Sequence, residues 1–167
     1  MSLAQSLLPE FDHEMASTRR ALERVPEERF GWKPHGKSMS LGRLASHLAE
    51  IPTWGSVTVE TSELDMSPPG GPPYKAADFP TRAQVLAQFD VAVVQARTAI
   101  AGATDADLFG PWTLKNSGQV IFTMPKIAVL RSFVLNHLIH HRGQLTVYLR
   151  LNDVAVPSLY GPSADEG

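Results

Sequence analysis

Two histidines near the C-terminus have the spacing at which one helix can present two imidazoles to the same metal ion. His137 and His141 are four residues apart, so on a helical wheel turned by about 100° per residue they lie about 40° apart. The same side of the wheel carries the apolar residues of this segment, namely Leu130, Val134, Leu138, Leu145 and Tyr148. His140 falls at the edge of that stripe. We therefore expect His137 and His141 to face the interior, where a shared cation would satisfy both imidazoles.

A third ligand has to come from another segment, because two histidines seldom hold a metal ion alone. His47 is the best candidate, since it lies beside Leu44 and Leu48 on the apolar side of an expected helix. His13, in an acidic stretch, and His35, in a loop, are less suited. The chain has six histidines and no cysteine, which excludes thiolate ligands, disulfides and a cysteine nucleophile from this chain. From spacing alone, hydrogen-bonded structural histidines remain the alternative to a metal site.

Four segments with helical periodicity would position these histidines. The second of them follows Ser40, a favourable N-cap, and contains Pro52, which should kink the helix or restart it. The four predicted helices cover residues 3–24, 41–60, 81–102 and 125–151. Amphipathic helices of these lengths favour an all-α fold, a four-helix bundle around one core.

Long connections separate the predicted helices. Residues 61–79 hold four prolines and two glycines within positions 68–73, so we expect an irregular surface loop there, long enough to allow a crossover topology. Residues 103–124 are interpreted as a loop with room for a short strand or hairpin, because apolar and polar residues alternate near its end. The tail, 154–167, is expected to be irregular. No repeat or linker divides the chain, which predicts a single domain over 1–167.

The composition restricts the partners. The chain has 167 residues, with 15 Lys and Arg against 17 Asp and Glu, for a formal net charge of −2. This balance offers no polycation for a nucleic-acid backbone, so we expect no nucleic-acid partner. No apolar stretch approaches the roughly 18 residues of a membrane span, and the N-terminus lacks the basic and apolar regions of a signal peptide. We therefore expect a cytoplasmic protein with no membrane partner.

Three stretches of the sequence together carry a family resemblance. They are Asn136–Leu145 (NHLIHHRGQL), Gly31–Pro34 followed by Ser40–Glu50, and the tail Val156–Glu166. In this order they resemble the DinB-like (DinB/YfiT) superfamily of proposed metalloenzymes, over nearly the whole chain. The resemblance implies a four-helix bundle, commonly a homodimer, in which His47, His137 and His141 hold a divalent metal ion. Family members of known activity are mostly thiol transferases that use bacillithiol, mycothiol or glutathione, including a mycothiol-dependent maleylpyruvate isomerase.

Three nitrogen ligands would leave an open position on the metal and the full charge of the ion to polarise what binds there. A bound thiol would become a strong nucleophile toward a small electrophile, and it would have to be a cosubstrate because the chain has no cysteine. Zinc, nickel and manganese all suit such a site. The alternatives are a metal-dependent hydrolase that uses the same site with water, and a non-catalytic stress-response metal-binding protein.

Four neighbours of the proposed ligands share a helix face with one of them and are predicted to support the site: Glu50, Gln144, Trp54 and Tyr148. Glu50 and Gln144 lie three residues after a ligand and could orient its imidazole. Glu50 could instead act as a base or be a solvated carboxylate. Trp54 and Tyr148 lie seven residues after a ligand, where they would line a pocket or belong to the core. Arg43 and Arg142 are expected at the surface.

Overall fold

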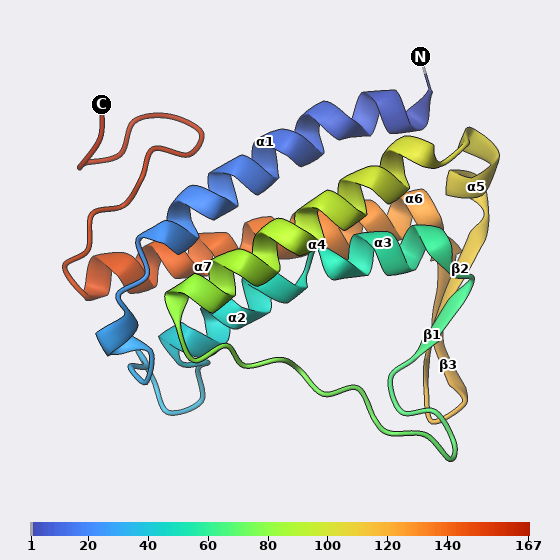
Figure 1. Ribbon diagram of the computed structural model, residues 1–167, viewed down its shortest axis with the longest axis horizontal. Coiled ribbons are helices and arrows are strands. Elements are labelled where there is room, and N and C mark those ends of the chain that lie inside the picture. Colours follow the sequence, from blue (N-terminus) through green and yellow to red (C-terminus); the bar gives the residue numbers. More distant parts are fainter. Residues whose placement is uncertain (1) are drawn as a thin grey trace.

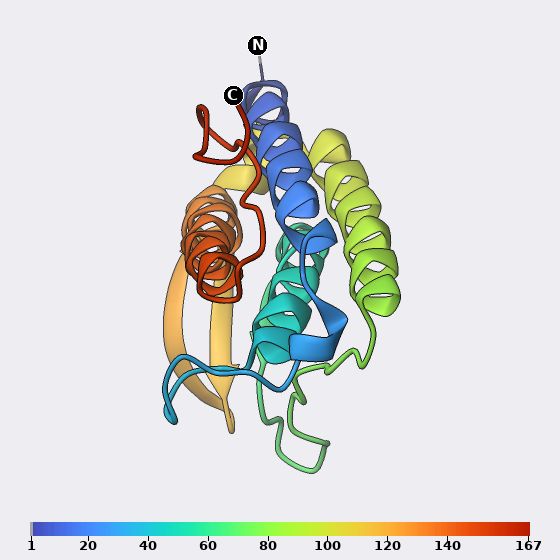
Figure 2. The same ribbon diagram turned by 90° about the vertical axis from the view of Figure 1, so that its left-hand side faces the viewer.

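Long helices built from the predicted segments pack around one apolar core in the computed structural model, which describes residues 2–167 (Figures 1 and 2). Seen along its length in Figure 2, the bundle has α1 beside α4, with α7 and the α2–α3 pair completing it. The helices are α1 Leu3–Glu23, α2 Leu41–Glu50, α3 Thr53–Glu60, α4 Arg82–Gly102, α5 Asp105–Phe109, α6 Lys126–Val129 and α7 His137–Leu151. A 3-10 turn, η1 (Glu27–Arg29), and a π-helix, η2 (Leu130–Asn136), complete the helical part.

Hydroxyl side chains start three of the long helices. The Oγ of Ser2 accepts a hydrogen bond from the Gln5 amide, and the Oγ of Ser40 accepts one from the Arg43 amide, both at 3.2 Å. Thr81 caps α4 in the same way. These bonds satisfy amide groups that have no partner inside the helix. Pro52 interrupts the second segment as predicted, because α2 ends at Glu50 and α3 begins at Thr53.

The last helical rod contains a feature that the periodicity did not predict. It runs without a break from α6 through η2 into α7, and the π-helical section ends directly before His137. A π-helix has wider turns than an α-helix, and such insertions are frequent at functional sites. Leu135 belongs to this section and is buried, although it lies outside the apolar stripe of the helical wheel.

A small sheet at one end of the bundle makes the prediction of an all-α fold wrong in part. Strands β2 (Pro111–Asn116) and β3 (Gln119–Pro125) form an antiparallel hairpin, in agreement with the strand or hairpin expected within 103–124. Ser117 and Gly118 have positive φ angles, as a two-residue hairpin turn requires. β1 (Glu63–Asp65) pairs in parallel with β2, inside the stretch predicted to be irregular. That pairing joins segments about 50 residues apart, so local sequence carries no signal for it.

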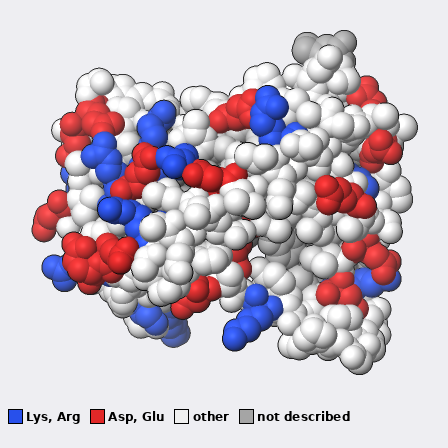
Figure 3. Space-filling model, in the orientation of Figure 1, with Lys and Arg blue, Asp and Glu red and all other residues white. Residues whose placement is uncertain are grey.

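The sheet is attached to the bundle through Trp112, which is 1% exposed. Its indole N–H donates a hydrogen bond to Thr61 Oγ1, 3.1 Å away, just beyond the end of α3. At the other end of the molecule the irregular tail after α7 folds back beside α1 (Figure 1). Acidic and basic side chains are interspersed on the face seen in Figure 3. Within residues 2–167, no helix combines the length and the apolar character needed to cross a membrane.

The start of α2 packs so closely on η1 that it has room only for glycine. A Cβ atom on Gly42 would lie 2.8–2.9 Å from the Phe30 side chain. We expect Gly42→Ala to destabilise the fold by about 1–3 kcal/mol through overpacking. Gly143→Ala is the matched control, because its added Cβ would meet nothing within 4 Å beyond its chain neighbours and the backbone of its own helix, and it should stabilise α7 by about 0.5–1 kcal/mol. Urea unfolding measures both, and equal effects of the two changes would contradict the packing argument.

Candidate metal centre

The fold brings the three predicted ligands together. His47 comes from α2, and His137 and His141 come from the first two turns of α7. The Nε2 atom of His137 lies 3.2 Å from that of His47 and 2.9 Å from that of His141. One ligand atom from each of the three residues lies within 4.8 Å of the other two. The three imidazoles therefore converge on one point between the two helices.

Hydrogen bonds on the opposite ring nitrogens set the tautomers of two of these imidazoles. Nδ1 of His137 lies 3.3 Å from the carbonyl oxygen of Phe133, and Nδ1 of His141 lies 2.8 Å from Oε1 of Gln144. Both oxygens can only accept, so each Nδ1 must carry the proton and donate it. In the neutral imidazole the Nε2 atom then holds a lone pair. These lone pairs are directed at each other and at His47.

This donor set fits a divalent metal ion. Lone pairs that face one another at 2.9–3.2 Å repel unless a cation or a proton lies between them. Two nitrogens bound to one ion at about 2.0–2.1 Å are about 3.0–3.4 Å apart, close to the observed separations. The three histidines form a group that can hold a metal ion through nitrogen alone, and three protein ligands do not complete the coordination of a four-coordinate ion.

Comparison with known proteins identifies the family of this chain. All 167 residues, 1–167, match the model of the DinB family. The chain belongs to the DinB family. The uncharacterized protein YrdA of Bacillus subtilis strain 168 is 28% identical over 159 residues, which cover 95% of this chain and 89% of YrdA. The DinB resemblance of the sequence motifs is thereby confirmed.

Two solved DinB-like structures share the fold. A protein from Bacillus cereus ATCC 10987 superposes with a TM-score of 0.70 at 22% identity, covering 93% of this chain and 97% of that one. YjoA of Bacillus subtilis gives a TM-score of 0.69 at 18% identity, and the match covers 93% of this chain and 99% of YjoA. At these identities the likeness extends to the fold, and the properties of the site in this DinB protein rest on its own residues.

Burial keeps the imidazoles of His137 and His141 in this DinB protein neutral. It lowers the pKa of His137, and the nearby His47 adds to the effect. Burial also lowers the pKa of His141 to about 4, although its hydrogen bond to Gln144 acts in the opposite direction. Both residues are therefore unprotonated near neutral pH, the form that binds metal.

The lowered pKa values predict how the metal-free protein responds to acid. Below the ordinary histidine pKa of 6.5 the unfolded chain takes up protons that folded His141 does not bind until about pH 4. Stability should therefore fall as the pH is lowered from 6.5 toward 4. Urea unfolding in the presence of a chelator measures this, with His141→Gln as the comparison, because the variant lacks the titrating group and should show a flatter profile. Identical profiles for the two proteins would contradict the assignment.

Glu50 is buried and fully engaged, so it is not a solvated carboxylate. Its Oε2 accepts hydrogen bonds from the two Nη atoms of Arg43 at 3.1 and 3.2 Å and lies 3.8 Å from Nδ1 of His47. Its Oε1 accepts from the hydroxyl of Tyr74 at 3.2 Å and from the amide of Ala77. Burial alone would raise the pKa of Glu50, but the nearby His47 imidazole, the hydrogen bond from the Ala77 amide and the charge of Arg43 outweigh it and lower the pKa. Glu50 thus remains an anion beside His47.

The two aromatic candidates lie in different places. Trp54 packs edge-to-face on Tyr74 at 5.8 Å and lines a pocket beside Glu50. Tyr148 is 9% exposed, packs against Trp32 and donates a hydrogen bond to the Met39 carbonyl at 3.3 Å, which makes it part of the core. Tyr74 and Ala77 were not found from the sequence. They lie in the proline-rich connection, where no periodicity indicates which residues turn toward α2.

The remaining histidines stay outside the triad. His140 is exposed and accepts a hydrogen bond from Nε2 of Gln144 at 3.1 Å. His13 stacks on Tyr160 at the surface, and the Nδ1 of His35 accepts from the Lys37 amide in the loop before α2. These positions separate the six histidines into three that converge and three that do not.

Arg142, directly after His141, is 1% exposed, so its expected surface position is wrong. Its Nη2 lies 2.6 Å from Oε2 of Glu14, and its Nη1 donates to the Glu14 carbonyl at 3.1 Å. Tyr160 covers the pair, with its hydroxyl donating to Glu14 at 2.8 Å and its ring 5.0 Å from the guanidinium. Glu14 lies 128 residues earlier in the chain, so no short-range pattern could reveal the pair.

Proposed function

We propose that this protein is a divalent-metal-dependent S-transferase that joins a low-molecular-weight thiol to a small electrophile. The observation that supports the proposal most directly is the convergence of the Nε2 atoms of His47, His137 and His141 from two helices. Three protein ligands are the number typical of catalytic metal sites, because the open position is left for a reactant. Zinc, nickel and manganese are the candidate ions, and the thiol would be of the bacillithiol, mycothiol or glutathione type.

A bound divalent ion would supply the positive charge that keeps a thiol deprotonated near neutral pH. The residues of the chain would hold that site in a fixed geometry. The Phe133 carbonyl and Gln144 orient His137 and His141, and Glu50 lies behind His47. Such partners keep a metal-binding imidazole in one tautomer and orientation. The chain has no cysteine, so the sulfur nucleophile has to come from a cosubstrate.

The state of Glu50 favours a thiol over water as the nucleophile. Hydrolysis would be helped by a carboxylate base, but the carboxylate that contacts His47 already accepts bonds from Arg43, Tyr74 and Ala77. Its lowered pKa also makes it a weak base. A thiol, with a pKa of about 8.5, loses its proton far more readily than water does and needs no such base.

The test is thiol-dependent consumption of 1-chloro-2,4-dinitrobenzene by untagged protein loaded with zinc, nickel or manganese. The sulfur–carbon bond forms as the carbon–chlorine bond breaks, chloride leaves with the bonding electrons, and the thiol proton goes to solvent. We expect acceleration that requires both metal and thiol and that is lost in His141→Ala but kept in His140→Ala. Acceleration in none of the metal and thiol combinations would overturn the proposal.

The same protein samples separate the alternatives. Hydrolysis of activated esters that needs metal but no thiol would show that the site uses water. Tight metal binding without turnover in either assay would leave a non-catalytic metal-binding role. Each of these outcomes contradicts S-transfer.

A further inference from the structure

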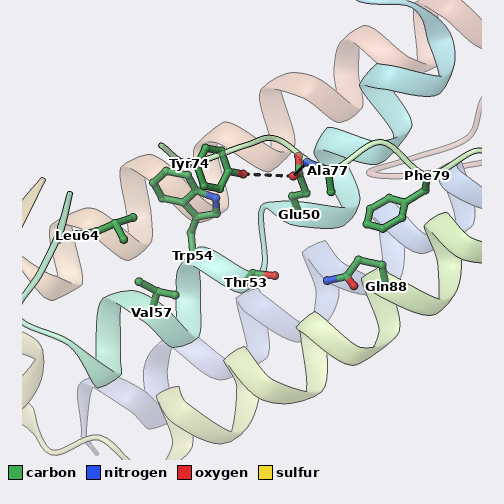
Figure 4. A pocket seen from close by; sticks show the side chains of 9 residues that line it. All are labelled: Glu50, Thr53, Trp54, Val57, Leu64, Tyr74, Ala77, Phe79 and Gln88. Carbon is green, nitrogen blue, oxygen red and sulfur yellow. Dashed lines mark hydrogen bonds between the residues drawn. The ribbon is translucent and has the colours of Figure 1, made fainter. Parts of the chain in front are cut away.

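A pocket of about 390 Å³ lies beside α3, under residues 66–80, which we call the strap (Figure 4). Its walls combine two aromatic residues of the strap with side chains from β1, α3 and α4, among them Trp54, Val57, Leu64, Tyr74, Phe79 and Gln88. In the described part of the chain, the metal-site histidines do not line it. The pocket and the metal centre thus share Glu50 but are separate spaces.

The roof of this pocket is held in place. The hydroxyl of Tyr74 and the amide of Ala77 both donate to Oε1 of Glu50, and Figure 4 shows the bond from Tyr74 across the top of the pocket. Nη1 of Arg43 donates to the Ala77 carbonyl at 2.9 Å, and the amide of Phe79 donates to Ser46 Oγ at 3.0 Å. The strap has no regular structure of its own over this stretch, but these bonds to α2 give the pocket a fixed shape before anything enters it.

The lining indicates what the pocket accepts. Trp54 and Tyr74 meet edge-to-face, with ring centroids 5.8 Å apart and planes at 70°, which leaves aromatic surface toward the interior. The charge of Glu50 is already matched by Arg43, so the pocket presents neither a free cation for an anionic ligand nor a free anion for a cationic one. Gln88 and Thr53 supply uncharged polar groups at its wall. A volume near 390 Å³ suits a small organic molecule and is too small for a peptide helix.

We propose that this pocket binds a small uncharged aromatic molecule, independently of the metal. The site requires neither the metal nor the S-transferase reaction, so it can be tested on metal-free protein. Two sources share this chemistry: the apolar body of the electrophile that the enzyme consumes, and a separate effector. In both cases Glu50 connects the occupied pocket to His47, whose Nδ1 lies 3.8 Å from its carboxylate.

The probe is N-phenyl-1-naphthylamine, a neutral fluorophore, titrated into metal-free protein. We expect saturable binding with a dissociation constant of about 0.1 mM or tighter for a ligand of this size. Its sulfonated relative, 8-anilinonaphthalene-1-sulfonate, has the same rings and a negative charge, and should bind at least about 10-fold more weakly because no free cation faces it. Equal affinity for the two probes would overturn the assignment of ligand class.

Val57→Phe should fill the pocket and weaken binding of the neutral probe by at least about 10-fold. Val94→Phe is the matched control, because Val94 is 65% exposed on α4 and lies outside the pocket. Thermal unfolding of both variants verifies that they remain folded, and Val57→Ala, which enlarges the pocket, should keep binding if Val57→Phe proves unstable. Unchanged probe binding in folded Val57→Phe would overturn the site, as would loss of binding in Val94→Phe.

The two sources of ligand are distinguished in the transferase assay. If the pocket holds the body of the electrophile, the neutral probe should compete with it and raise KM without changing kcat. If it holds an effector, the probe should change kcat at saturating electrophile. Both results support the site. Failure of the transferase assay overturns only the proposed reaction, because the titration of metal-free protein stands by itself.

Discussion

His137→Ala should weaken the binding of zinc, nickel or manganese by more than about 100-fold. His137 is the central member of the triad, since its Nε2 lies 3.2 Å from that of His47 and 2.9 Å from that of His141. Without it two imidazoles remain, one on each helix, and two nitrogens seldom hold a divalent ion. Loss of an outer partner of a metal ligand typically costs 10–100-fold in affinity, so loss of a ligand itself should cost more. Competition with a chromophoric chelator, on untagged protein, measures the affinity.

Two variants make this measurement specific. His140→Ala removes the exposed histidine next to His141, and we expect the metal affinity to stay within about threefold of the wild type, because His140 packs on the ring of His141 and contacts Gln144 but supplies no ligand atom to the group. Gln144→Leu removes the acceptor for Nδ1 of His141, 2.8 Å away, and should cost about 10–100-fold. The loss of metal affinity should therefore be largest in His137→Ala, smaller in Gln144→Leu and smallest in His140→Ala. An equal loss in His137→Ala and His140→Ala would show that the metal binds elsewhere.

Local periodicity was sufficient to predict which histidines face inward, because a helix determines the direction of its side chains over short distances. The spacing of His137 and His141 and the apolar neighbours of His47 place all three on the inner side of their helices, and the fold brings these three residues together. The caps Ser40 and Thr81 and the break at Pro52 are equally local signals. These features depend on residues at most four positions apart.

Features that join distant segments could not be predicted in this way. The bonds from Tyr74 and Ala77 to Glu50 join residues more than 20 positions apart, and the parallel pairing of β1 with β2 joins residues about 50 apart. In both cases the tertiary structure, and not the neighbouring sequence, determines which residues come into contact. The π-helix η2 is different, since it is local but shifts the inward face of the rod away from the 3.6-residue repeat that the helical wheel assumes.

Arg142→Met should destabilise the protein by about 3–5 kcal/mol, because it leaves the carboxylate of Glu14 buried without its charge partner. The guanidinium is 1% exposed and Glu14 is 5% exposed, so water cannot replace the missing partner without disrupting the core between α1 and α7. The Glu14 carboxylate would keep the hydroxyl of Tyr160 as a donor, 2.8 Å away, and that single bond does not balance a buried charge. Urea unfolding at pH 7 measures the loss.

The double variant Glu14→Leu/Arg142→Met distinguishes two contributions to the free energy of unfolding: the cost of leaving Glu14 unpaired and the stabilisation that the ion pair provides. An apolar pair of similar volume needs no compensating charge, so the double variant should be more stable than Arg142→Met alone. If the double variant instead loses as much as the sum of the two single changes, Glu14 and Arg142 are not energetically coupled, which would contradict the argument from the unpaired charge. Tyr160→Phe keeps the ring over the guanidinium and removes only the hydroxyl, so it should cost about 1 kcal/mol. A far larger loss from Tyr160→Phe would mean that the tail, through this hydroxyl, holds the whole α1–α7 interface together.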